Sequence, residues 1–578
     1  MKVTVKGQGP VTLTQSHFVA TGGQASVYIK DATAYKIYTD PKDAIPEAKF
    51  KALAAIQDPA VVRPQSLLLD GHGVAIGYTM DAVTGGYALC QLFTRTFRDK
   101  HRVTQDTVVG LTTRLREHVD SVHRANALIV DLNELNVLVS GGLDDTFLID
   151  VDSYQVPGYP ATVIMPSVRD HSVSAKDFSE KSDWFSYAVL VFQLFVGAHP
   201  YKGTHPPSSQ LPKDKVLEHR MRERISAFRA DVRLPKCCYS IDSIPQQLRD
   251  WLRAVLEDGK REHPPLPGVA PSVAATPLAA LVTQQGGKLT IDLIADHSPW
   301  TVAQHVESAG HTLTLLRKRD RVQFTLDGVR TLNEFLTHEK TWIVGFTPML
   351  SRPFAMSLMG DQLTFYDLEA RTHQVLEFGA EALAESSGRV AIKRGGSVLE
   401  VEFSEIRNGT VVHAARQIAS VMEKASTLHD GCAIQNMLGS VFVSLFPRAH
   451  AGYQVRMPEL DGHKIVEAKC DGGVLMVLAA YQGRYYRFVF RFDAEYQTYD
   501  VRIAADVQLS SLNFVTLDHG VCVCITEDEK LEAFSARKGS AGIKVVEDPA
   551  IGSDLRLMKV RGKAGFERDG KIYVLGLK

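Results

Sequence analysis

Two acidic residues and an asparagine have the types and the spacing that phosphoryl transfer needs. Asp131 and Asn136 stand five positions apart, between two apolar stretches. Phosphoryl transfer uses a carboxylate that orients the attacking hydroxyl and accepts its proton, and an amide oxygen that holds Mg²⁺ against the phosphates. Asp150 ends the next apolar stretch, fourteen residues after Asn136, where a second metal ligand would be needed. The spacing predicts Asp131 as the base and Asn136 with Asp150 as Mg²⁺ ligands.

These motifs resemble those of the protein kinase superfamily, in which a catalytic loop is followed by a strand that ends in a metal-binding aspartate. The form D-L-N-x-x-N followed by I-D-x-D-S-x-Q resembles a bacterial kinase-like family, the helix-hairpin-helix-topped kinases and their relatives. The resemblance implies that Asp131 is the base, that Asn133 contacts the γ-phosphate, and that Asn136 and Asp150 bind the metal. Asp152 is a reserve ligand.

The same resemblance assigns ATP-binding roles upstream. The run T-G-G-Q-A-S-V-Y lies at an expected hairpin turn and resembles the kinase loop whose backbone N–H groups approach the phosphates. Lys36 on the next strand and Glu47 at the start of the following helix would form the pair that holds the α- and β-phosphates. The remaining residues implied for ATP binding are Gly22, Gly23, Val27 and, at the hinge, Met80.

Each of these residues also has a plainer interpretation. Asp131 and Asn136 are of the types that make hydrogen bonds within turns, and a pair of glycines often marks an ordinary hairpin. Lys36 could be an exposed strand residue, and Glu47 could favour a helix start. The order of the whole series favours the functional interpretation, because glycine loop, lysine, glutamate, Asp131 loop and Asp150 follow one another as in kinases.

The elements that would position these residues change along the chain. Short strands precede longer helices up to residue 263, a Pro- and Ala-rich stretch without periodicity follows at 264–277, and short alternating strands fill 278–578. We expect an α+β fold class: a two-lobed protein kinase-like catalytic domain (1–263), a linker (264–277) and an all-β domain (278–578). Strand groups recur at about 40 residues, which favours a β-propeller, although a large β-sandwich or a two-sheet domain is an alternative.

The composition limits the classes of partner. Lys plus Arg (65) nearly equals Asp plus Glu (66), so no overall charge attracts nucleic acid. No apolar run is long enough to span a membrane, and the first residues have no secretory pattern, so a cytoplasmic protein without a membrane partner is expected. The seven cysteines lack the spacing of a zinc site or of a disulfide framework.

The expected function is that of an ATP- and Mg²⁺-dependent kinase. It would transfer the γ-phosphoryl group to Ser or Thr of a protein substrate, itself included, while the C-terminal β domain recruits the substrate or a protein partner. Two alternatives stay open: an ATP-binding pseudokinase scaffold that signals through the β domain, and a small-molecule phosphotransferase.

Overall fold

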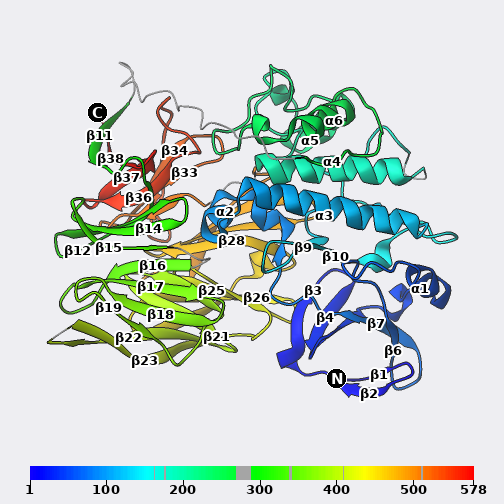
Figure 1. Cartoon of the computed structure of the whole chain (residues 1–578), viewed down its shortest axis with the longest axis horizontal. Helices are drawn as coiled ribbons and strands as arrows, with labels where there is room; N and C mark the ends of the chain where they lie inside the picture. Colours follow the sequence, from blue (N-terminus) through cyan, green and yellow to red (C-terminus); the bar gives the residue numbers. More distant parts are fainter. Residues whose placement is uncertain are drawn as a thin grey trace.

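The computed structural model describes residues 1–161, 163–174, 177–268, 288–336, 341–407, 409–508 and 512–577. It contains an N-terminal part up to residue 268 and a set of four-stranded sheets from residue 288 onward (Figure 1). The linker expected at 264–277 falls outside the described residues from 269 onward.

A seven-stranded antiparallel sheet opens the chain, in the order β2-β1-β6-β7-β5-β4-β3. Several of its short strands are joined by tight polar turns, as in Lys30-Asp31-Ala32-Thr33 between β4 and β5. Helix α1, Glu47–Leu53, follows β5, and its Leu53 is buried. The strands are β1 Lys2–Val5, β2 Gly9–Thr12, β3 Phe18–Thr21, β4 Ala25–Lys30, β5 Thr33–Tyr38, β6 Ser66–Leu69 and β7 Ala75–Asp81.

Two long helices, α3 and α4, contact each other, and in Figure 1 they lie above this sheet. In α3, apolar residues three or four apart are buried along one face from Val108 to Val122, and the Thr104 hydroxyl accepts the N–H of Thr107 to cap the helix start. Helix α4 is buried on nearly all sides and is followed by Gly197, whose φ of 83° suits glycine. The helices are α2 Arg95–His101, α3 Gln105–Arg124, α4 Glu180–Val196, α5 Lys213–Arg222 and α6 Gln246–Leu256. A small sheet joins β8 Tyr87–Ala88, β9 Val137–Val139 and β10 Thr146–Leu148.

Seven four-stranded antiparallel sheets form the rest of the chain, which we call the β ring (residues 289–577). The first strands of most neighbouring sheets contact one another, and β11 pairs with β38, so that one sheet joins the start of this region to its end. Such closure leaves few exposed sheet edges. The sheets are β11 Leu289–Asp296 with β36 Arg556–Val560, β37 Lys563–Arg568 and β38 Lys571–Leu577; β12 Thr301–Ser308, β13 His311–Lys318, β14 Arg321–Leu326 and β15 Arg330–Leu336; β16 Thr341–Phe346, β17 Pro353–Met359, β18 Gln362–Asp367 and β19 Thr372–Val375; β20 Ala382–Ser386, β21 Arg389–Arg394, β22 Ser397–Ile406 and β23 Gly409–Ser420; β24 Ser426–His429, β25 Cys432–Met437, β26 Ser440–Arg448 and β27 Ala451–Arg456; β28 Lys464–Asp471, β29 Val474–Tyr481, β30 Arg484–Phe492 and β31 Tyr499–Ala505; and β32 Phe514–Thr516, β33 Val521–Ile525, β34 Leu531–Ser535 and β35 Ile543–Val546.

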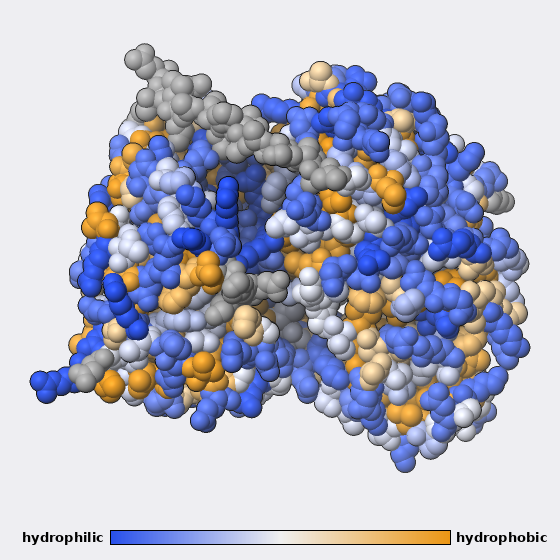
Figure 2. All heavy atoms as spheres, viewed as in Figure 1, coloured by the Kyte–Doolittle hydropathy of each residue, from blue (hydrophilic) through white to orange (hydrophobic). Residues whose placement is uncertain are grey.

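The N-terminal part and the β ring share one hydrophobic core. Buried residues of β28 to β30 and of the segment after β31 belong to the same apolar cluster as the long helices, among them Val466, Leu478 and Val507. Ion pairs at the rim of this contact include Arg556 with Asp99 at 3.1 Å. On the face shown in Figure 2, hydrophilic residues predominate and apolar residues occur in small groups. The two parts are therefore packed together.

The expected α+β class with a two-lobed, kinase-like fold is wrong. The chain is mostly β, with 43% strand and 17% helix, and the described residues form many small antiparallel sheets and only six α-helices. The order of the motifs selects candidate polar residues, but it does not determine how much of a chain lies in sheets. No helix among the described residues is both long and apolar enough to cross a membrane.

Candidate functional site

One buried carboxylate holds the start of the loop that carries Asp131. Asp183, fully buried in the first turn of α4, accepts the backbone N–H groups of Ile129 and Val130, both at 2.8 Å. The same carboxylate lies 2.9 Å from His123 Nε2. Val130 has a φ of 63°, which is uncommon for a β-branched residue. Asp183 thus fixes the position at which the loop begins.

Asn133 lies inside this loop. Its Oδ1 accepts the N–H groups of Leu135 at 2.9 Å and Asn136 at 3.2 Å, and its Nδ2 donates to the main-chain oxygen of Asp131 at 3.2 Å. These are the local hydrogen bonds that asparagine makes in turns. The structure therefore gives Asn133 a place as a buried turn residue, and its side chain does not point out of the loop as a phosphate contact would.

Asn136 is placed beside Asp150 by the backbone. The N–H of Ile149 donates to the main-chain oxygen of Asn136 at 3.0 Å, so the two residues predicted to bind the metal are brought together. The Asn136 Nδ2 group donates to the main-chain oxygen of Asp131 at 3.2 Å. This use of the amide nitrogen leaves Asn136 Oδ1 available as an acceptor.

The carboxylate of Asp131 is partly covered by a segment from further along the chain. The backbone N–H of Met165 donates to Asp131 Oδ1 at 2.7 Å, and Asn136 Nδ2 lies 3.4 Å from Oδ2. Burial raises the pKa of Asp131, the nearby charge of Asp150 adds to that increase, and the bond from Met165 opposes it. A carboxylate with a raised pKa is a stronger base once it is ionised.

Lys36 is held between two carboxylates. Its Nζ lies 2.5 Å from Asp150 Oδ1 and 2.7 Å from Asp152 Oδ1. The two partners differ in exposure, because the side chain of Asp150 is 42% exposed and that of Asp152 only 8%. The hydroxyls of Tyr38 and Tyr78 also donate to Asp152, at 2.6 and 2.7 Å. Asp152 is the buried anchor of this group, and Asp150 is its solvent-facing member.

The sheet explains why these side chains meet. Tyr38 is two residues beyond Lys36 on β5, and Tyr78 on β7 is the direct cross-strand partner of Lys36, so the three share one face. Burial would lower the pKa of Lys36, but the charges of Asp152 and Asp150 raise it. Burial would raise the pKa of Asp152, but Lys36 and the two tyrosines lower it. Both groups therefore stay charged.

The predicted pair of Lys36 and Glu47 is not formed. Glu47 is 53% exposed and contacts Lys51 at 3.2 Å and Lys6 at 3.4 Å. Lys49, two positions later on α1, turns inward instead and donates to the main-chain oxygen of Asp152 at 2.7 Å. Asp152 therefore takes the place expected for Glu47.

The glycine turn between β3 and β4 is open. A Cβ atom added to Gly22 would come no closer than 4.0 Å to Ala25 O, and one added to Gly23 would meet nothing within 4 Å. Val27 is the cross-strand partner of Lys36, which puts it on the same face, whereas Met80 pairs with Ala34. Because local packing does not require either glycine, the turn leaves room for an approaching group.

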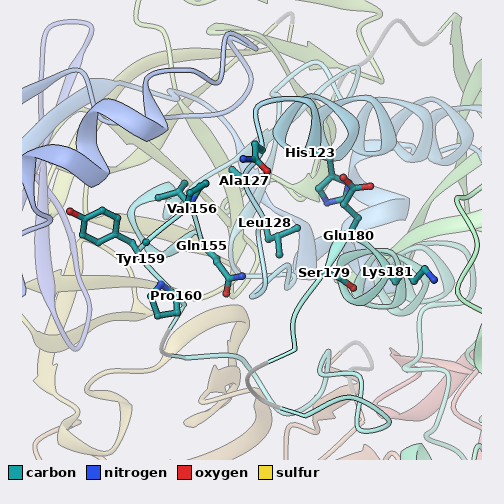
Figure 3. Close-up of a pocket in the computed structure, with 13 residues that line it drawn as sticks. His123, Ala127, Leu128, Gln155, Val156, Tyr159, Pro160, Ser179, Glu180 and Lys181 are labelled. Atoms are coloured by element: carbon teal, nitrogen blue, oxygen red, sulfur yellow. The ribbon is translucent and has the colours of Figure 1, made fainter.

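A cavity of about 860 Å³ lies beside the start of the Asp131 loop (Figure 3). Figure 3 shows Tyr159 and Pro160 at one end of it and Ser179, Glu180 and Lys181, at the start of α4, at the other. No residue predicted for the site lines it. Sequence reasoning missed this cavity, since its walls combine the end of α3, the start of α4 and the loop around residues 155–160, which no single motif joins.

The side-chain oxygens of Asn136 and Asp150 fit a cation that prefers oxygen ligands, such as Mg²⁺. Asn136 has its amide oxygen available, and Asp150 is accessible. Within the described residues, no group of three or more His, Cys, Asp and Glu side chains could hold a metal ion. Because Mg²⁺ is often bound by one or two protein ligands together with substrate phosphates, this small set suits a metal that arrives with a nucleotide.

Sequence reasoning thus found most of the polar centre and missed some of it. Asp131, Asn136, Asp150 and Lys36 come together, while Glu47 lies outside. Asp152 was only a reserve ligand, and Tyr38, Tyr78 and Lys49 were not predicted. The period-two spacing of Lys36 and Tyr38 on one strand was a signal that could have found Tyr38. No protein-family model matches this chain, and a search of curated proteins found no match.

Proposed function

We propose that this chain binds ATP with Mg²⁺ and transfers the γ-phosphoryl group to a Ser or Thr hydroxyl of a protein. One observation carries the proposal: the partly exposed carboxylate of Asp150 is paired with the largely buried Lys36, and the backbone places Asp150 next to the Asn136 and Asp131 loop. Phosphoryl transfer requires this combination of a fixed cation, oxygen ligands for metal and a carboxylate base.

Lys36 is suited to hold phosphate oxygens. Asp152 and the two tyrosines keep its ammonium group in place from the buried side. Its ion pair with the more exposed Asp150 is the contact that a phosphate oxygen could replace. A phosphate oxygen that replaced Asp150 would leave this carboxylate for the metal. Asn136 and Asp150 would hold Mg²⁺, which neutralises phosphate charge when bound.

Asp131 would orient the acceptor hydroxyl. As the new P–O bond forms and the bond from the γ-phosphorus to the leaving oxygen breaks, the hydroxyl proton passes to the carboxylate. The Met165 N–H donates to Oδ1 at 2.7 Å, whereas Oδ2 has only the longer contact with Asn136 Nδ2 at 3.4 Å, so Oδ2 would take this proton. The raised pKa of Asp131 supports the role, because proton transfer is most effective when the pKa of the base is near the working pH.

The test is transfer of labelled γ-phosphate from ATP to the chain itself and to a general protein acceptor. We expect Lys36→Met, Asp131→Asn and Asp150→Asn each to lower transfer by about 10²-fold or more. Glu47→Gln is the matched control and should leave transfer within about twofold, because Glu47 is exposed and away from Lys36. Equal loss in Glu47→Gln, or no loss in Asp131→Asn, would refute these roles.

A second candidate function is ATP binding without transfer. It is favoured by the bond of Met165 to the carboxylate of Asp131 and by the use of Asn133 within its own loop. Tight binding of ATP with no transferred label under any divalent metal would establish it. The cytoplasmic location and the recruitment of a protein partner by the β ring remain predictions. The seven cysteines, all of which lie in described residues, form no disulfide bond.

A further inference from the structure

The β ring reaches into the Asp131 loop through one buried hydrogen bond. Tyr485, in strand β30, donates its hydroxyl to Glu134 Oε1 at 2.6 Å. Glu134 lies between Asn133 and Asn136 in the loop, and only 3% of it and 5% of Tyr485 are exposed. The two residues are 351 positions apart. A buried hydrogen bond between these two side chains holds both of them in place, because bulk water does not reach them.

Four buried side-chain oxygens meet around a cavity beside this bond. Within the part of the chain that the structure describes, Glu134 Oε2, Ser167 Oγ, Gln193 Oε1 and Gln508 Oε1 are buried without a hydrogen-bond partner, and all four residues line a cavity of about 20 Å³. One water molecule needs roughly 10–15 Å³ and two to four polar partners. It could donate to two of these oxygens and accept from Ser167. The site therefore suits one enclosed water.

The same hairpin of the ring also supports the segment that covers Asp131. Gly483 lies in the turn between β29 and β30 with a φ of +73°, and a Cβ atom there would come within 2.6 Å of Met165 Cγ and 3.4 Å of Ser167 Oγ. Met165 in turn bonds to Asp131 through its N–H. The hairpin of β29 and β30 thus contacts both the Asp131 loop and its cover.

We propose that Tyr485 and Glu134 are positioning residues of the phosphoryl-transfer site, and that with one enclosed water they fix the loop that carries Asp131 and Asn136. The role in catalysis rests on the proposed function, whereas the coupling of ring to loop does not. The β ring is then a working part of the site and not only a recruiting module.

The first test replaces Tyr485 by Phe in the full chain, with Tyr486→Phe as the matched control. Tyr486 is the next residue of β30 and packs beside His463 and Phe488 within the ring. We expect Tyr485→Phe to speed amide hydrogen exchange in residues 129–136 and 163–168, and to lower kcat about tenfold or more with an unchanged KM for ATP. The control should change neither. If amide hydrogen exchange in the Asp131 loop were equally fast in Tyr485→Phe and in Tyr486→Phe, the proposal would be overturned.

A second pair of variants separates positioning from simple space filling. Glu134→Gln keeps an oxygen that can accept from Tyr485, so it should retain exchange and kcat near those of the wild type, while Glu134→Ala should behave like Tyr485→Phe. Equal effects of the two substitutions would overturn the role of the hydrogen bond. This pair carries the test if Tyr485→Phe does not fold. A high-resolution crystal structure should show one water within hydrogen-bond distance of Glu134 Oε2 and Ser167. An empty cavity would contradict the role given to this water.

The outcomes also distinguish this proposal from the proposed function. If the wild type transfers no phosphate, hydrogen exchange still tests the coupling of ring to loop. If transfer occurs and the loop loosens while kcat is unchanged, the positioning role is refuted and phosphoryl transfer stands.

Discussion

The two ends of the candidate site are built in different ways. At the Lys36 end, an ammonium group, a buried carboxylate and two tyrosine hydroxyls satisfy one another. At the Asp131 end, the carboxylate depends on the N–H of Met165, and the neighbouring Glu134 depends on Tyr485.

The difference separates a rigid anchor from an adjustable loop. A buried charge with all its partners in place is hard to move, because any displacement leaves charges and hydroxyls unpaired. The Asp131 loop instead takes support from the Met165 N–H and the Tyr485 hydroxyl, which are uncharged donors and can change position without breaking an ion pair. Under the proposed function, nucleotide binding at the Lys36 end and phosphoryl transfer at the Asp131 end would therefore be under separate structural control.

The largest effect should come from removing the anchor. Asp152→Ala leaves the buried Lys36 ammonium without its main partner and the hydroxyls of Tyr38 and Tyr78 without an acceptor, so it should lower the free energy of unfolding by about 3–5 kcal/mol. Asp150→Ala removes an exposed partner and should cost about 1 kcal/mol or less. Urea unfolding measures both. Equal losses in the two variants would mean that the anchor and the exposed carboxylate do not differ.

The pH dependence should have opposite signs at the two ends. The folded state lowers the pKa of Asp152, so its contribution to stability is present above its unfolded pKa and is lost as the pH falls through the folded value. The folded state raises the pKa of Asp131, so its contribution is present at low pH and is lost as the pH rises through the folded value.

Urea unfolding of wild type, Asp152→Asn and Asp131→Asn between pH 3 and 7 measures these signs. The stability advantage of the wild type over Asp152→Asn should grow as the pH rises, and its advantage over Asp131→Asn should shrink. If the two stability differences changed with pH in the same direction, burial would not be the dominant influence on the pKa of Asp131.

The smallest effect is expected at the glycine turn. Gly22→Ala and Gly23→Ala place a Cβ in open space at a backbone conformation that alanine can adopt, so each should raise stability by about 0.4–1 kcal/mol. Gly77→Ala is the contrasting control, because its Cβ would lie 2.0 Å from the main-chain oxygen of Lys36. Thermal unfolding measures stability and titration with ATP measures binding. Unchanged ATP affinity in both turn variants would exclude the turn from the site.

Part of the site could be predicted because strand and loop spacing determine it. Asp131 and Asn136 share one short loop, and Lys36 sits on a strand whose faces alternate. Glu47 was misplaced because sequence order does not determine which side of a short helix faces inward. Residues 47 and 49 lie about 200° apart around α1, so only one of them can face Asp152, and it is Lys49.

The rest depends on contacts between distant segments. Nothing near Glu134 indicates that its partner is Tyr485, since a pairing across 351 residues leaves no local pattern. The α+β class was wrong for a related reason. The motifs lie in a minority of the chain, and the strands of the β ring, read as an appended domain, make the whole chain mostly β.

The core shared between the long helices and the β ring has a consequence for synthesis of the chain. The helices emerge from the ribosome well before β28 to β30, which complete their apolar cluster. At roughly 5–20 residues per second, the 351 residues between Glu134 and Tyr485 take about 20–70 s to add. During that interval the nascent helices present unburied apolar side chains, so a chaperone that shields them has a defined window in which to act.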